Sequence, residues 1–166
     1  DPTNANFSIA VGAARSKGLE FDMNAKLPAD MRVFATYAYT DAEVAEDYRD
    51  PNFNLSVLEG SPLINVPKHT ANLMLFKDFD VGTGTASVGG GINHVSKRLG
   101  ETGVSFYLPS YTLVKLQASY EPMEQVKLSV DVNNLFDKRY YASSYARLWV
   151  APGTPRTVTG RVSYNF

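Results

Sequence analysis

The 166-residue sequence predicts an all-β fold, made of about seven antiparallel strands of a transmembrane β-barrel. Segments along the whole chain alternate apolar and polar residues with a period of two, which is typical of strands with one apolar and one polar face. The connections between these segments are alternately short and long. This order is typical of outer-membrane barrels, which have short periplasmic turns and long extracellular loops.

The alternation is clearest in residues 125–135, where every second residue from Val126 to Val132 is apolar and the residues between are polar or charged. No segment of the chain shows a helical period. Five regular strands are expected at residues 19–27, 31–40, 111–120, 125–135 and 157–166.

Two further strands, at residues 70–79 and 85–95, are less regular. In the first, Met74 and Phe76 stand where the alternation requires polar residues. In the second, the run of glycines at 89–91 indicates a strand that bends sharply or that another group approaches closely. Together with the five regular strands, these two complete the expected seven.

The connections are sorted by length. Because successive antiparallel strands place odd and even connections at opposite ends of a sheet, we expect tight turns at one end and large loops at the other. A soluble sandwich has no reason to sort its loops in this way, and such long loops are uncommon in compact soluble domains. The short connections are residues 28–30, 80–84 and 122–124, and the long ones are 41–69, 96–110 and 137–155.

The two faces of the expected sheet differ in their chemistry. Charges on the polar face would need partners in a dry core but can face a wet lumen, and aromatic residues near strand ends fit interfacial girdles facing outer-membrane lipid. A soluble sheet with one wet face is the alternative, but it leaves the sorting of the loops unexplained. The charged residues are Glu20, Asp22, Lys26, Lys115, Asp131 and Arg161, and the aromatic residues are Tyr37, Tyr39, Tyr120, Tyr164 and Phe166.

The composition excludes several other classes of protein. The 16 basic and 17 acidic residues give a net charge of -1, so no basic field favours nucleic acid. The absence of Cys excludes disulfides and thiolate metal sites, and the lack of a long apolar run excludes a transmembrane helix. No Ser lies in a nucleophile-elbow pattern and only two His are present, so we expect no enzyme, no catalytic residues and no resident metal or cofactor.

Seven strands do not close a barrel by themselves. The number is odd, and an open antiparallel sheet leaves two unpaired edges, which are costly in lipid. We therefore expect residues 1–166 to be the C-terminal portion of a larger barrel, which needs detergent or the rest of the barrel in order to fold.

Five stretches, in order along the chain, carry a resemblance to one family. Residues 132–141 read VNNLFDKRYY, which is similar to the NNLFDKxYY signature of TonB-dependent outer-membrane ferric siderophore receptors. Because the stretches span nearly the whole chain, the sequence resembles the C-terminal part of the β-barrel of these receptors. The other four stretches are residues 14–21, 34–41, 60–69 and the closing segment 152–166.

The resemblance implies a barrel of about 22 strands around a plug, in the outer membrane of a Gram-negative bacterium. It also implies a whole protein that binds and imports ferric siderophores with energy passed on by TonB. The plug and the TonB box lie N-terminal in the family, so we expect this chain to lack the plug and the TonB complex to bind elsewhere. Phe166 resembles the end of the signal read by the barrel-assembly machinery. The alternatives are a passive pore, a structural barrel, or a receptor for haem or cobalamin.

Ligand contacts are expected on the long-loop side. Ferric siderophores are often anionic with aromatic or hydroxamate rims, so arginine and aromatic side chains suit them. Tyr140 and Tyr141 are expected to belong to the scaffold instead. The candidate contacts are Tyr145, Arg147 and Trp149 in the third long connection, Tyr107 in the second, and Tyr48, Arg49 and Phe53 in the first.

His69 and His94 lie near the loop ends of adjacent expected strands. A neighbouring pair of histidines suggests iron or haem ligation, and the alternative is that each is a hydrogen-bonded histidine at the barrel rim. The sequence lacks the FRAP motif of haem receptors, which argues against haem. Asn133 and Asn134 are expected to satisfy backbone groups where the strand leaves the sheet.

Overall fold

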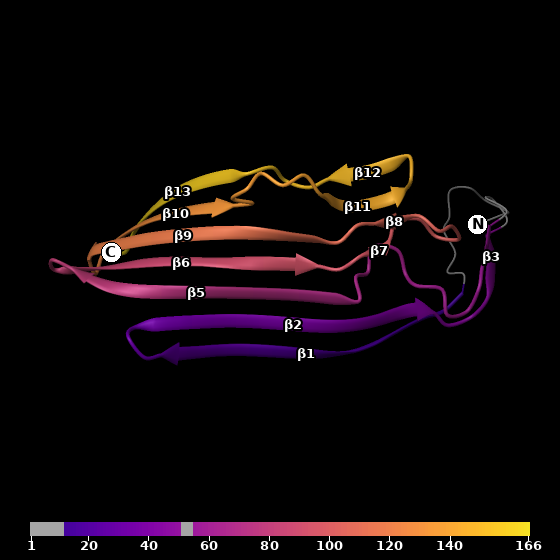
Figure 1. The fold of residues 1–166 in the computed structure, drawn as a ribbon, viewed down its shortest axis with the longest axis horizontal. Helices are drawn as coiled ribbons and strands as arrows, with labels where there is room; N and C mark the ends of the chain where they lie inside the picture. The colour runs from indigo at the N-terminus through magenta and orange to yellow at the C-terminus, as the bar shows by residue number, and fades with distance from the viewer. Residues whose placement is uncertain (1–11, 51–54) are drawn as a thin grey trace.

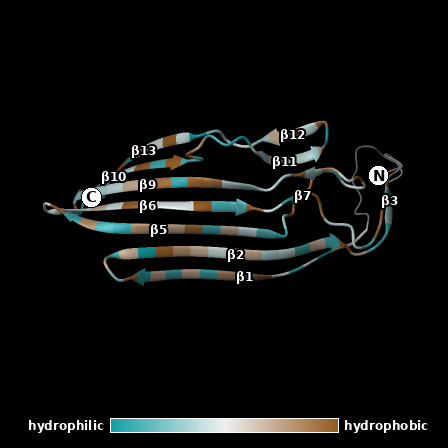
Figure 2. Ribbon diagram, in the orientation of Figure 1, coloured by the Kyte–Doolittle hydropathy of each residue, from teal (hydrophilic) through white to brown (hydrophobic). Residues whose placement is uncertain are grey.

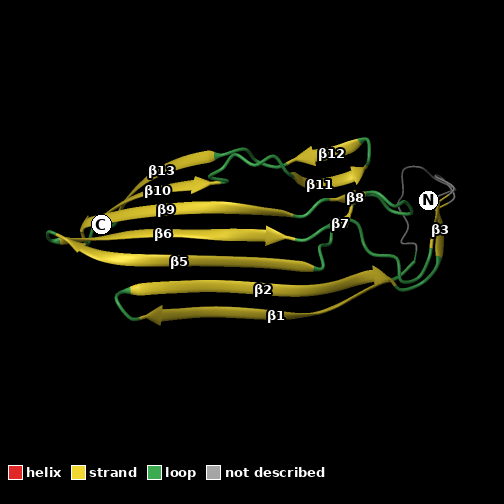
Figure 3. Cartoon of the chain, viewed as in Figure 1, coloured by secondary structure: helices red, strands yellow, loops and turns green. Residues whose placement is uncertain are grey.

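The computed structural model describes residues 12–50 and 55–166, and this part of the chain is all-β (Figure 3). Seven strands form one antiparallel sheet in which each long strand pairs with the next long strand along the chain (Figure 1). The predicted number and arrangement of strands are therefore confirmed. Over the described residues, no helix is long and apolar enough to span a membrane. The strands are β1 (Ala14–Leu27), β2 (Met31–Val44), β5 (His69–Val81), β6 (Gly84–Val95), β9 (Tyr111–Met123), β10 (Val126–Asn133) and β13 (Thr157–Tyr164).

The register gives the sheet an apolar face, called here the outer face, and a mainly polar inner face. Hydrophobic and hydrophilic residues alternate along the long strands (Figure 2), and cross-strand partners keep the same character across the sheet. One apolar row consists of Ala25, Val33, Leu75, Gly90, Leu116, Val132 and Val158. A row of the inner face consists of Lys26, Arg32, Phe76, Gly89, Gln117, Asp131 and Thr159.

Large side chains on the inner face account for two of the three successive glycines in β6, Gly89 and Gly91. The rings of Phe34 and Phe76 meet edge to face with centroids 5.8 Å apart. A Cβ atom on Gly89 would lie 2.3 Å from the Phe76 ring, and a Cβ atom on Gly91 would lie 2.3 Å from the sulfur of Met74. The two glycines thus leave space for side chains of β5, which confirms the close approach expected there.

The connections are sorted as predicted, with tight turns at one end of the sheet and long loops at the other (Figure 1). Each long connection also contains a short hairpin that forms its own two-stranded sheet. The sequence did not predict these hairpins, because strands so short have no readable periodicity. They pair β3 (Tyr48–Asp50) with β4 (Leu55–Val57), β7 (Arg98–Leu99) with β8 (Tyr107–Leu108), and β11 (Tyr141–Ala146) with β12 (Trp149–Pro152).

The two most buried apolar side chains, Val57 and Leu108, lie among the long loops rather than on the sheet. Val57, Leu99 and Leu108 are only 2 %, 6 % and 1 % exposed. On the outer face, Leu19 and Phe21 are 75 % and 56 % exposed. A continuous apolar face of this kind is suited to contact with lipid.

Aromatic side chains mark both ends of the apolar outer face. The Tyr39 and His69 rings lie 5.3 Å apart at the loop end, and the Tyr164 and Phe166 rings lie 5.5 Å apart at the turn end. Along β5, the outer face runs from His69 to Phe79. These residues are about 33 Å apart along the strand, which a tilt of about 40° reduces to about 25 Å of height. This is the height of the lipid-facing band of an outer-membrane barrel.

Candidate functional site

Hydrogen bonds join the three long loops at one place. The Asn65 side chain donates to the carbonyl oxygen of Ser144 at 2.7 Å and accepts from its amide at 2.9 Å. The Ser144 hydroxyl donates to the carbonyl oxygen of Gly100 at 2.5 Å. Asn65, Gly100 and Ser144 come from the first, second and third long loops, and we call them the loop junction. The junction holds the β11–β12 hairpin against the other two loops.

Arg98 adds a second attachment for this hairpin. The side chain is 3 % exposed, and its Nη2 donates to the carbonyl oxygens of Tyr141 at 2.6 Å and Ala142 at 2.8 Å. The guanidinium lies 5.5 Å from the centroid of the Tyr111 ring, which in turn lies 4.4 Å from the Tyr140 ring. Buried contacts of this kind make Arg98 and Tyr140 part of the packing that supports the loops.

The β11–β12 hairpin carries the three main predicted ligand contacts. Tyr145 and Trp149 are 72 % and 67 % exposed, and their ring centroids lie 6.0 Å apart. Leu148 is 83 % exposed, and the sequence prediction missed it although it stands next to Trp149. Tyr145, Leu148 and Trp149 form an exposed apolar surface, which we call the hairpin tip. Arg147 lies between Tyr145 and Leu148 in the sequence.

Glu101, from the second long loop, binds Arg147 closely. Both the Nε atom and the backbone amide of Arg147 donate to Oε2 of Glu101, each at 2.9 Å. These hydrogen bonds lower the pKa of Glu101 from its ordinary value of 4.5, and the bond from the Arg147 side chain contributes most to this shift. An anionic ligand would have to compete with Glu101 for the Arg147 guanidinium. The aromatic rings are therefore better placed than Arg147 to contact a ligand.

The other predicted contacts lie on two further loops. Tyr107 of β8 is 41 % exposed, and Nζ of Lys97 lies 4.3 Å from the centroid of its ring. Tyr48 and Arg49 belong to β3, in the first long loop. Phe53 lies outside the described residues. The structure thus groups Tyr145, Arg147 and Trp149 on one hairpin and places the remaining described candidates elsewhere.

Each histidine has a hydroxyl partner of its own. Nδ1 of His69 shares a hydrogen bond with the Tyr37 hydroxyl, and Nδ1 of His94 shares one with the Thr112 hydroxyl, both at 2.8 Å. These contacts fit hydrogen-bonded histidines at the rim of the outer face. Within residues 12–50 and 55–166, no group of three or more His, Cys, Asp or Glu could hold a metal ion.

The most specific of the family-like stretches forms the exit from β10. Asn134 is 3 % exposed with a φ of 50°. Its side chain donates to the carbonyl oxygens of Lys138 at 2.9 Å and Thr154 at 3.2 Å, and accepts from the Lys138 amide at 2.9 Å. Oδ1 of Asp137 accepts from the Arg156 amide at 2.8 Å. These contacts, called here the exit turn, join the end of β10 to the start of β13 and confirm the backbone role expected of Asn134.

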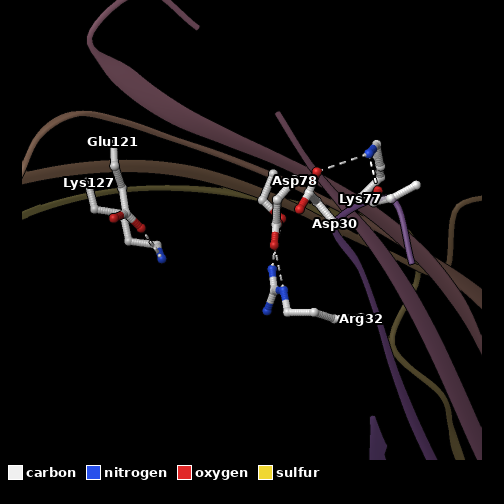
Figure 4. Close-up of polar contacts among 8 residues, drawn as sticks. Asp30, Arg32, Lys77, Asp78, Glu121 and Lys127 are labelled. Carbon is white, nitrogen blue, oxygen red and sulfur yellow. Dashed lines mark hydrogen bonds and ion pairs between the residues drawn. The ribbon is translucent and has the colours of Figure 1, made fainter. Parts of the chain in front are cut away.

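Paired charges line the inner face near the short turns (Figure 4). Arg32 donates from Nε and Nη2 to the two carboxylate oxygens of Asp78, each at 2.8 Å, and its Nη2 also donates to the Ser87 hydroxyl at 3.0 Å. Lys127 pairs with Glu121 at 2.7 Å. These four charges thus have partners on neighbouring strands of the inner face, where a wet lumen also accommodates charges without a partner.

Comparison with known proteins decides the family. Residues 1–135 match the family described as "TonB dependent receptor-like, beta-barrel". The chain belongs to the TonB-dependent receptors. Over its whole length, this TonB-dependent receptor chain is 40 % identical to "Metal-pseudopaline receptor CntO" from Pseudomonas aeruginosa, of which it covers 23 %. It is 30 % identical over its whole length to the "Ferrichrome outer membrane transporter/phage receptor" of Escherichia coli, of which it covers 22 %.

Solved structures of other receptors have the same fold. The crystal structure of BauA, the ferric preacinetobactin receptor from Acinetobacter baumannii, matches with a TM-score of 0.75 and 28 % identity over 95 % of this chain and 23 % of that one. The siderophore receptor PiuA from the same species matches with a TM-score of 0.73 and 25 % identity over 92 % of this chain and 22 % of that one. The predictions of a TonB-dependent receptor barrel and of a location in the outer membrane of a Gram-negative bacterium are confirmed.

Proposed function

We propose that this chain is the C-terminal part of the barrel of a receptor that binds a small metal chelate outside the cell and imports it with energy from TonB. One relative is named for ferrichrome and another for metal-pseudopaline, and both ligands are metal chelates. The ligand proposed here is a ferric siderophore, with a related metal chelate as the second candidate. Coupling to TonB is assigned to a region of the protein outside this chain.

The observation that carries this proposal is the hairpin tip. Two exposed aromatic rings on one hairpin offer a large contact area with few torsions to order. Because the loop junction and Arg98 attach the hairpin to the other loops, little further ordering is needed when a ligand binds. We assign supporting contacts with the chelate to Tyr107 and Arg147. Tyr48 and Arg49 are assigned contacts with it from the first long loop.

The turn end of the outer face supports a proposal about assembly. Tyr164 and Phe166 are both exposed and pack against each other through their rings, 5.5 Å apart. A pair of exposed aromatic residues at this position suits recognition by the barrel-assembly machinery, which we propose as a partner of Phe166.

The test of the binding proposal is Trp149→Ala in the full-length protein, titrated by fluorescence with ferrichrome and with a metal–pseudopaline complex. Removal of a central aromatic contact typically costs about 2 kcal/mol, so affinity for the chelate that the wild type binds should fall about thirtyfold. The matched control is Leu58→Ala, which removes a 63 % exposed apolar side chain from the first loop and should leave affinity unchanged. Wild-type affinity in the Trp149 variant would refute the site.

Uptake by cells distinguishes import from passive flow. Saturable uptake of the bound chelate that stops when TonB is deleted is the expected result. Uptake that rises linearly with the concentration of the chelate and does not depend on TonB would identify a passive pore. Binding of haem or cobalamin alone would show that the chelate class is wrong.

A further inference from the structure

A charged cluster lies on the outer face, at the loop ends of β1 and β2. In register, Arg15 is opposite Glu43 and Lys17 is opposite Asp41. The next outer-face pair toward the turns joins Leu19 with Tyr39, so the alternation along β1 places Arg15 and Lys17 on the same face as the apolar band. Lys68, directly before β5, reaches Asp41 at 3.2 Å.

The basic side chains of this cluster are much more exposed than the acidic ones. Arg15 contacts Glu43 at 2.5 Å, with exposed side-chain fractions of 56 % and 20 %. Lys17 and Lys68 lie 3.7 Å and 3.2 Å from Asp41, and their exposed fractions are 65 % and 58 % against 20 % for Asp41. The carboxylates therefore lie beneath and orient the cations, which form the surface that meets the surroundings. Glu59, in the first long loop, also attracts the Arg15 guanidinium electrostatically.

The height of the cluster corresponds to the headgroups of the outer leaflet. Along β1, the apolar side chains of the outer face run from Leu27 to Leu19, about 26 Å along the strand. A strand tilt of about 40° reduces that length to about 20 Å of height, and the further step to Lys17 brings it to about 25 Å, the height of the lipid-facing band of an outer-membrane barrel. Lys17 is the next outer-face residue toward the loops, so its ammonium lies where the acyl chains end and polar headgroups begin.

We propose that Arg15, Lys17 and Lys68 form a binding surface for the phosphate groups of lipid A, the phosphorylated glycolipid of the outer leaflet. Basic clusters at headgroup height bind anionic lipid headgroups through charge-assisted hydrogen bonds. Leu19 and Phe21, exposed below the cations on the same face, contact the acyl chains of the same lipid. The proposal rests on the location in the outer membrane and not on the identity of the imported chelate.

The test compares lipid A with enzymatically dephosphorylated lipid A as ligands for the full-length protein, in detergent, by native mass spectrometry. Wild-type protein should retain lipid A and release the dephosphorylated lipid. The variant Lys17→Gln with Lys68→Gln should bind lipid A about thirtyfold more weakly, since each basic residue near a headgroup contributes about fivefold. The matched control, Lys26→Gln with Lys115→Gln, removes two lysines of the inner face and should bind as the wild type does.

A further variant separates phosphate binding from a merely structural ion pair. Asp41→Asn removes the carboxylate from both lysines but keeps the two cations, so it should retain lipid A. Equal losses in the Asp41 variant and in the double lysine variant would overturn the proposal. Equal affinity of the wild type for the two lipids, or an equal loss in the inner-face control, would also overturn it.

Discussion

Replacing Asn134 with alanine is expected to loosen the exit turn between β10 and β13. The buried Asn134 side chain makes three hydrogen bonds, two to Lys138 and one to Thr154. At about 1 kcal/mol for each bond, their loss costs about 3 kcal/mol. Alanine is also less favourable than asparagine in the left-handed conformation, where φ is 50°, which adds about 1 kcal/mol. The free energy of opening the turn should therefore fall by up to about 4 kcal/mol.

Two further substitutions divide this loss into its parts. Asn134→Gly keeps the backbone conformation without strain, so it should cost about 3 kcal/mol from the hydrogen bonds alone. Asn134→Asp keeps an acceptor for the Lys138 amide but directs a buried carboxylate oxygen at the carbonyl oxygens of Lys138 and Thr154, so it should cost more than Asn134→Gly. The control Phe136→Ala removes a 74 % exposed side chain from the same turn and should have no effect.

Amide hydrogen exchange of the full-length protein in detergent measures the opening of the turn. Suitable reporters are the amides of Arg156 and Gly153, which donate to Asp137 and Tyr140. A loss of about 4 kcal/mol corresponds to exchange up to about a thousandfold faster. Identical rates for the alanine and glycine variants would show that the backbone contribution is wrong. Unchanged rates in both would show that the Asn134 side chain does not hold the turn.

Three other predictions concern the sheet and the loops. Gly89→Ala places a Cβ atom 2.3 Å from the Phe76 ring, so it should lower the free energy of unfolding in urea by about 1–3 kcal/mol. Adding Phe76→Ala should restore part of this loss, and an equal effect of Gly89→Ala with and without the Phe76 ring would contradict the prediction. Because the pKa of Glu101 is lowered from 4.5 by Arg147, the stabilisation by this pair is complete above that value and is lost as pH falls through the lowered pKa. The Arg147 amide should thus remain protected from hydrogen exchange at about pH 5 and lose this protection in more acidic solution. If protection is lost between neutral pH and about pH 5, or if Glu101→Gln shows the same pH dependence, Glu101 is not the group that protects this amide. Asn65→Ala, which breaks the loop junction without touching the hairpin tip, should weaken chelate binding through a slower, less ordered association; unchanged affinity would show that the junction does not position the hairpin.

Local patterns in the sequence were enough to predict the sheet. Each long strand carries its own alternation, so the faces, the seven strands and the sorted connections follow from residues close together in the chain. The exit turn was also predictable in part, since Asn134 binds Lys138 only four residues away. The hairpins were missed: β11 and β12 pair with register shifts near Ser143 and Ala146, which disrupt the alternation on which prediction depends.

The sequence by itself determined the fold class and the lipid-facing and lumen-facing residues, because period-two alternation needs no knowledge of distant partners. Only the tertiary structure decided how the long loops are held. Asn65 and Ser144 lie 79 residues apart in the sequence, and Glu101 and Arg147 lie 46 apart. No local pattern specifies such contacts, since they depend on the order of the strands in the sheet. For this reason the candidate residues were found from the sequence, whereas the partner that competes for Arg147 was found only in the structure.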